Sequence, residues 1–147
     1  MPPSEKTARQ DWISLLAKAD PEALRALIPE LPGHDILRGP EIGTVMVQGR
    51  INGTGAAFNL GEMTVTRCSA RLSCGAVGHA MIQGRNRDHA LRAALGDALM
   101  QREASEAGRE TTLAPLRRAA AARRQTRAAK AAATRVEFFT LVRGEDK

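Results

Sequence analysis

Most side chains of this 147-residue chain that could do chemistry lie in or just after residues 53–68. Glycines open this segment and permit a tight turn, and the polar, β-branched residues that follow favour a strand. Arginine binds phosphate-like oxyanions through two parallel hydrogen bonds, so Arg67, with Arg71, Arg85 and Arg87 nearby in the sequence, predicts an oxyanion contact. The candidate contacts to a substrate, a phosphate or a partner are Asn59, Glu62, Thr64, Thr66, Arg67, His79 and Arg85.

Other chemistries can be built from the same region, but each has a more ordinary interpretation. Cys68 and His79 could form the nucleophile and base of a hydrolase, although a small residue within a strand is usually buried. Glu62 and Asp97 could act as a carboxylate pair, yet a helix aspartate more often pairs with arginine. His79 is expected to be an interior histidine. No catalytic residue is therefore predicted.

The cysteine and histidine content gives no sign of a metal or cofactor site. Cys68 and Cys74 form no CxxC pair, and the histidines are His34, His79 and His89. Two reduced cysteines are expected, with no metal and no cofactor bound by this chain alone. Neither an N-terminal apolar core nor a run of roughly 20 apolar residues is present, so we expect a cytoplasmic protein without membrane contact.

The periodicity of the chain predicts an α+β fold in a single domain over residues 1–147. An antiparallel sheet of about four strands is expected, with an N-terminal helical hairpin and two longer helices, the last rich in alanine and arginine. The predicted parts are a helical hairpin over 1–33, a sheet and helix core over 41–107, a basic helix over 109–135 and a C-terminal strand over 136–144.

Within the core, strands are predicted over 41–51, 62–72 and 76–83. In the second strand the apolar residues switch from odd-numbered to even-numbered positions. This switch indicates either a bulge near Thr66 and Arg67 or a strand covered on both faces, and we favour the bulge. A helix capped by Asn86 or Asp88 should follow. Gly108 is expected to break this helix before the basic one begins.

The positive charge is concentrated in one stretch. Residues 109–135 hold eight Arg or Lys side chains and one acid, a net charge of +7, whereas the whole chain carries +6. Such a helix can bind nucleic acid, but three phenylalanines, one tryptophan and no tyrosine leave little for base stacking. A solvated or partner-facing helix is the favoured interpretation, and nucleic acid is an unlikely partner.

Several blocks of the sequence together resemble one known family. Residues 55–68 (GAAFNLGEMTVTRC) are similar to the central signature of the PhnG family of phosphonate metabolism. Agreement continues in order over residues 40–50, residues 78–85 with His89 and Ala90, and residues 97–101 and 136–145.

The resemblance implies a subunit of the bacterial carbon–phosphorus lyase core complex. In that family the protein acts with other subunits in converting ATP and an alkylphosphonate to a ribose 1-alkylphosphonate 5-triphosphate with release of adenine, and the nucleoside chemistry is assigned to a different subunit. The implied role is accessory: assembly, with an arginine contact to phosphate. The alternatives are a small basic nucleic-acid-binding protein and, third, a stand-alone cysteine hydrolase.

Overall fold

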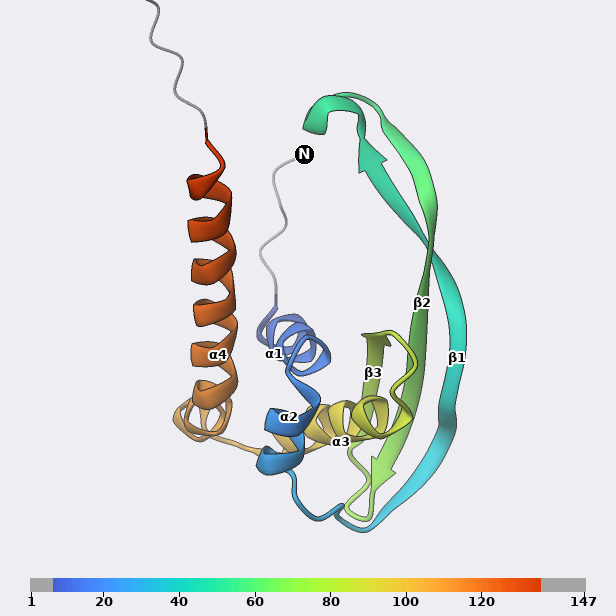
Figure 1. The fold of residues 1–147 in the computed structure, drawn as a ribbon. Helices are drawn as coiled ribbons and strands as arrows, with labels where there is room; N and C mark the ends of the chain where they lie inside the picture. Colours follow the sequence, from blue (N-terminus) through green and yellow to red (C-terminus); the bar gives the residue numbers. More distant parts are fainter. Residues whose placement is uncertain (1–6, 136–147) are drawn as a thin grey trace, which may run out of the picture.

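The computed structural model describes residues 7–135, which form an α+β fold in which helices pack on one antiparallel sheet (Figure 1). The described sheet has three strands in the order β1-β2-β3. The predicted fourth strand, residues 136–144, lies outside the described residues. The elements in chain order are α1 (Ala8–Ala17), α2 (Pro21–Leu27), β1 (His34–Arg50), the 3-10 helix η1 (Ile51–Gly53), β2 (Ala57–Leu72), β3 (Val77–Gln83), α3 (Arg87–Arg102) and α4 (Glu106–Ala133).

Both helices of the predicted N-terminal hairpin are present; each packs on α3, and each begins at a capping side chain. Thr7 and Gln10 form a reciprocal capping box at the start of α1. Asp20 accepts hydrogen bonds from the first backbone N–H groups of α2, and Pro21 occupies the first helical position. These local signals explain why the sequence was sufficient to place the hairpin.

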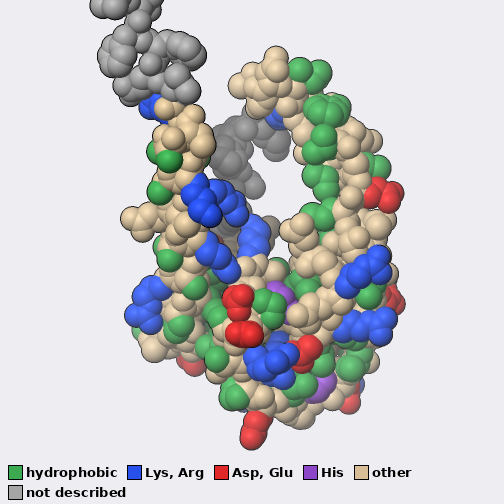
Figure 2. Space-filling view, viewed as in Figure 1, with side chains coloured by type: hydrophobic (Ala, Val, Ile, Leu, Met, Phe, Trp, Pro, Cys, Tyr) green, Lys and Arg blue, Asp and Glu red, His purple; other side chains and the backbone are tan. Residues whose placement is uncertain are grey.

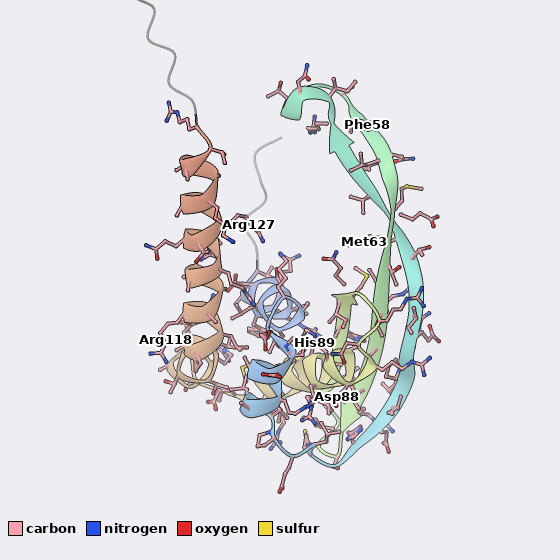
Figure 3. All side chains as sticks on the ribbon, in the orientation of Figure 1. Phe58, Met63, Asp88, His89, Arg118 and Arg127 are labelled. Atoms are coloured by element: carbon pink, nitrogen blue, oxygen red, sulfur yellow. The ribbon has the colours of Figure 1, made fainter. Side chains whose placement is uncertain are left out.

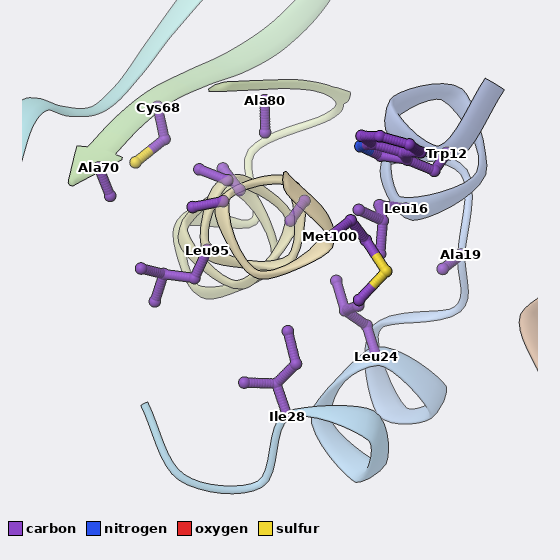
Figure 4. Packing of buried hydrophobic residues seen from close by; sticks show 14 of the residues in the cluster. Trp12, Leu16, Ala19, Leu24, Ile28, Cys68, Ala70, Ala80, Leu95 and Met100 are labelled. Carbon is purple, nitrogen blue, oxygen red and sulfur yellow. The ribbon is translucent and has the colours of Figure 1, made fainter. Parts of the chain in front are cut away.

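The hydrophobic core lies around α3, which packs between the sheet and the N-terminal hairpin (Figure 4). Small residues on α3 allow its backbone to approach the strands closely, and a β-carbon at Gly78 of β3 would clash with the Ala94 carbonyl oxygen. Leu16 of α1 and Leu24 of α2 are fully buried on the other side of the helix. The strands contribute Cys68, Ala70, Leu72, Ala80 and Ile82 to the same core.

β1 and β2 are longer than predicted, and the predicted bulge near Thr66 and Arg67 is wrong. The β2–β3 register is unbroken from Val65 to Arg71. The irregularities lie instead in the β1–β2 pairing. β1 has extra residues around 37–40, and β2 has one extra residue, Leu60, opposite the step from Val47 to Gln48. Pro40 lacks a backbone N–H, which makes an irregular position the natural place for it in a strand. Val65 and Thr66 are consecutive and both buried, so β2 is covered on both faces there.

Beyond β3 the sheet continues as a two-stranded ribbon, which we call the arm and define as residues 44–64. β3 pairs with β2 only over Val65–Arg71, whereas β1 and β2 pair as far as Arg50 and Ala57. The arm therefore extends past the body of the molecule, as Figure 1 shows. An isolated two-stranded hairpin is only marginally stable in water, so the arm depends on the sheet at its base.

α4 begins earlier than predicted because Gly108 does not break the chain. α3 ends at Arg102, and Ser105 then caps α4 by accepting a hydrogen bond from the Gly108 N–H at 2.9 Å. Only Leu113 and Leu116 of α4 are buried, and the second half of the helix projects from the body (Figure 1). No helix within residues 7–135 is long and apolar enough to cross a membrane.

Candidate functional site

Two of the predicted site residues, Arg67 and His79, come together on the face of the sheet opposite α3. His79 of β3 lies directly across from Ser69 of β2, and Arg67 is two residues before Ser69 on the same face. A cavity of about 300 Å³ opens here. We call this surface the Arg67 face; it is lined by Ile13, Arg38, Arg67, Cys68, Ser69, His79, Ala80 and Met81.

The guanidinium group of Arg67 has an unused donor. Its Nε is buried and has no hydrogen-bond partner among the described residues. The side chain lies across β1, where a β-carbon at Gly43 would come within 3.2 Å of the Arg67 Nη2 atom. A buried donor without an acceptor costs about 1–3 kcal/mol, so the geometry favours an acceptor brought by a ligand or a partner.

His79 is exposed, so its predicted interior position is wrong. Its Nδ1 atom lies 2.8 Å from the Ser69 hydroxyl oxygen on the solvent face. Successive residues of a strand point to opposite faces of the sheet. Gly78 and Ala80 point toward α3, so His79 points away from it. The interior histidine is His89 of α3, which is 6% exposed and donates from Nε2 to the Leu16 carbonyl at 3.1 Å.

Arg38 adds a second cation to the Arg67 face, but it is already paired. Its guanidinium forms an exposed ion pair with Glu41 at 2.7 Å. No salt bridge joins Arg67 to a carboxylate within residues 7–135. Arg67 is therefore the cation of this face that remains available to an oxyanion.

The remaining predicted site residues do not join this cluster. Thr66 is fully buried on the α3 side of β2, and its hydroxyl donates to the Gly84 carbonyl at 2.7 Å, which is a structural role. Glu62 and Thr64 lie along the arm, on the opposite parity from Arg67. The structure therefore separates these three residues from the Arg67 face.

Asn59 and Arg85 are also distant from the Arg67 face along the sheet. Asn59 accepts a hydrogen bond at 3.3 Å from Gln48 in the arm. Arg85 is exposed in the turn after β3. Neither contributes a group to the cavity beside Arg67.

Cys68 and His79, the possible nucleophile and base of a hydrolase, are not in contact. Cys68 is 1% exposed and points toward α3, whereas His79 lies on the opposite face of the sheet. Burial raises the pKa of the Cys68 thiol, which disfavours the nucleophilic thiolate. In the part of the chain that the structure describes, no three His, Cys, Asp or Glu side chains are grouped so that they could hold a metal ion.

Asp97 forms the most connected polar group of the body, and its role is structural. The fully buried carboxylate accepts from Arg9 at 2.9 Å, from the Trp12 indole at 2.9 Å and from the His79 backbone N–H at 3.0 Å. Pairing with an arginine was the interpretation that the sequence favoured, but the identity of Arg9 could not be derived, because it is 88 residues away. The sequence feature that could have indicated this structural role is an acidic residue within the apolar stripe of α3.

Asp97 also helps to close the outer edge of β3. The His79 N–H that points away from β2 is bound by this carboxylate. The neighbouring Val77 carbonyl accepts from the Gln101 amide at 2.7 Å. Side chains of α1 and α3 thus form hydrogen bonds with the backbone N–H and C=O groups of β3 that another strand would otherwise pair with.

Comparison with known proteins identifies the family. Residues 7–144 match the family model described as phosphonate metabolism protein PhnG. The chain belongs to the PhnG family. It is 43% identical over 141 residues to a protein of Rhizobium meliloti (strain 1021) named alpha-D-ribose 1-methylphosphonate 5-triphosphate synthase subunit PhnG. The alignment covers 94% of this chain and 90% of the relative, so the PhnG resemblance seen in the sequence is confirmed across the arm, the Arg67 face and α4.

Proposed function

We propose that this protein is an accessory subunit of an α-D-ribose 1-methylphosphonate 5-triphosphate synthase within a carbon–phosphorus lyase complex. The observation that carries the proposal is the 43% identity to a subunit of that synthase over nearly the full length of both chains. The substrates of the assembly would be ATP and an alkylphosphonate, and the products a ribose 1-alkylphosphonate 5-triphosphate and adenine. Use of ATP supports a cytoplasmic location.

The side-chain geometry supports a role without catalysis by this chain alone. Cys68 is buried away from His79, and Asp97 is engaged by Arg9, Trp12 and the β3 backbone. A general acid or base must reach the reacting atoms of a substrate, and neither group is placed to do so. The reaction is therefore assigned to companion subunits.

The Arg67 face supports a supplementary contact to substrate. Arg67 presents a buried, unpartnered Nε beside a cavity, and guanidinium groups match the geometry of phosphate and phosphonate oxygens. His79 and Arg38 lie in the same lining. We propose that this face binds an oxyanion of the substrate when the complex is assembled.

Reconstitution tests the proposed function. Synthase subunits expressed with and without this chain would be purified and supplied with ATP and methylphosphonate, and adenine release would be measured. Adenine should form only when this chain is present, and the isolated chain should release none. Full activity without the chain would contradict the proposal, as would its failure to co-purify with the other subunits.

One feature favours the alternative, nucleic-acid binding. Residues 111–135 contain no acid, and their exposed arginines could contact phosphates. The single tryptophan, however, is buried and hydrogen-bonded to Asp97, so it offers no stacking surface. Duplex DNA retention by the purified chain with a steep salt dependence, together with unchanged synthase activity in its absence, would select this alternative.

A further inference from the structure

The arm exposes apolar side chains that no described element covers. Large hydrophobic residues along it are strongly exposed, with Leu60 at 67% and Met46 at 53%. Ile51 and Phe58, near its end, are similarly accessible. Figure 3 shows Phe58 and Met63 at two levels of the arm, beyond the helices that pack on the body. Ile36, Leu37 and Met81 on the body are exposed as well, but those of the arm lie on a projection, where such groups indicate a binding surface.

The backbone of the arm is open as well. β3 stops pairing at Val65, so residues 57–63 of β2 have a strand on one side only within the described chain. This segment contains a single charged residue, Glu62, and no proline or lysine to discourage pairing. On the body, by contrast, the backbone groups at the outer edge of β3 already have partners, because Asp97 and Gln101 form hydrogen bonds with them. Within residues 7–135, the edge of β3 is thus bound by side chains, whereas residues 57–63 of β2 have no strand on the side away from β1.

Across from the arm, α4 presents a row of positive charge. Arg123, Arg124, Arg127 and Lys130 lie within one face of the helix by its periodicity of 3.6 residues per turn. Arg123 fixes the orientation of this face, since its guanidinium donates to the Lys18 carbonyl of the body at 2.9 Å. In Figure 3, Arg127 leaves α4 on the side of the arm, and Arg118 leaves on the opposite side.

The arm and α4 project from the body in the same direction, and no described element lies between their projecting ends (Figures 1 and 2). Hydrophobic side chains lie along the arm, and Lys and Arg side chains lie on α4. Glu110 is the last acid before residue 135, so the described part of α4 offers these cations no acidic neighbour after its second turn. A partner that fits this space would combine an apolar strand with an acidic surface.

We propose that another subunit of the synthase inserts between the arm and α4, adding an apolar β-strand to the arm and setting an acidic surface against Arg123, Arg124, Arg127 and Lys130. The inference rests on the proposed function, because it takes the partner to be a synthase subunit. Strand addition gives affinity through main-chain hydrogen bonds, and the charge pairs fix the register. The two-stranded ribbon gains a third strand, which removes its marginal stability.

Binding by matched variants tests the proposal. Leu60→Asp in the arm and Arg127→Glu on the inner face of α4 should each weaken assembly with the synthase subunits by about tenfold or more. The controls make the same changes elsewhere: Leu37→Asp on an exposed part of β1 below the arm, and Arg118→Glu on the outer face of α4. Both controls should assemble like the wild-type chain.

A second measurement examines the strand itself. In the assembled complex, backbone amides of residues 57–63 that point away from β1 should exchange hydrogen as slowly as those of residues 65–71. Rapid exchange there would overturn strand addition. A chain truncated after Arg135 gives a further check. If it still assembles with its partners but residues 57–63 no longer exchange slowly, the strand on this edge is formed by the chain's own residues 136–147. That result would also overturn the proposal.

The outcomes separate this inference from the proposed function. If the wild-type chain assembles with the synthase subunits and both test variants assemble equally well, the docking site is wrong and the function stands. If Leu60→Asp only converts a self-associated chain to a monomer, the occupant is a second copy and the inference fails. If the wild-type chain does not assemble with those subunits at all, the proposed function fails and the inference falls with it.

Discussion

Gly78 of β3 packs against the backbone of Ala94 in α3, with no space for a side chain between them. A β-carbon built on Gly78 would overlap the Ala94 carbonyl oxygen and lie 2.7 Å from the Ala98 nitrogen. These are backbone atoms, so relief requires the whole helix to move. Because α3 also carries Asp97, which binds the β3 edge, this contact sets the spacing between the helix and the Arg67 face.

Gly78→Ala should therefore lower the free energy of unfolding by about 3 kcal/mol or more, at the upper end of the range for overpacked cores. The measurement is denaturant-induced unfolding followed by circular dichroism. Gly61→Ala is the matched control, since a β-carbon at this arm position meets nothing within 4 Å. Equal stability of the two variants would show that α3 is not held against β3 as described.

The parts of the fold that the sequence predicted depend on local signals. Asp20 followed by Pro21 placed the start of α2, and the alanine and leucine stripe placed α3. The early start of β1 at His34 was missed because Gly39 and Pro40 are typical strand breakers, and the register tolerates them only through irregular pairing with β2. The arm was also missed in part, since a strand exposed on both faces has no burial pattern to mark its beginning.

The site was predictable in composition but not in arrangement. Arg67 was selected because guanidinium chemistry suits oxyanions, and it does line a cavity. His79 was assigned to the wrong face, because strand parity shows which residues share a side but not which side a helix covers. Two partners of Asp97, Arg9 and Trp12, come from α1, far away in the sequence, and only the folded chain brings them together.

Asp88 links α2 to α3 and should make stability depend on pH. Its carboxylate accepts from Arg25 at 2.9 Å and from Arg92 at 3.1 Å. The hydrogen bond from Arg25 is the largest cause that lowers the pKa of Asp88 from its ordinary value of 3.8; burial opposes it, and the hydrogen bond from Arg92 adds to the lowering. A lowered folded-state pKa stabilises the protein above the unfolded pKa, and this contribution is lost as pH falls toward the folded value.

Asp88→Asn should consequently lower stability at neutral pH by no more than about 1 kcal/mol, since the pair with Arg25 is exposed to solvent. The difference from wild type should shrink as the pH falls below about 4, where the unfolded carboxyl becomes protonated. Unfolding free energies measured across this range check both points. Arg25→Gln should cause part of the same loss and add little to Asp88→Asn. A difference that stays constant down to the lowest pH would contradict the assignment.

Arg67 provides the test of the oxyanion contact. Arg67→Ala in the assembled complex should lower kcat/KM for adenine release by about tenfold to a hundredfold, the loss expected for a charge-assisted hydrogen bond of about 1.5–3 kcal/mol. Arg67→Lys should recover only part of the activity, because an ammonium group keeps the charge but not the planar fork that pairs with two oxygens. Subunit composition would be checked by size-exclusion chromatography on the same samples.

The matched control for Arg67→Ala is Arg102→Ala, which removes an exposed guanidinium at the end of α3, away from the cavity. If both variants keep wild-type turnover in intact complexes, the unused Nε of Arg67 serves no substrate. If Arg67→Ala instead dissociates the subunits while Arg102→Ala does not, the acceptor of that donor is a carboxylate or carbonyl of a partner. A fall in kcat/KM with the subunits still assembled is the result that places a substrate oxyanion against Arg67, because only then is the lost interaction one that the reaction itself uses.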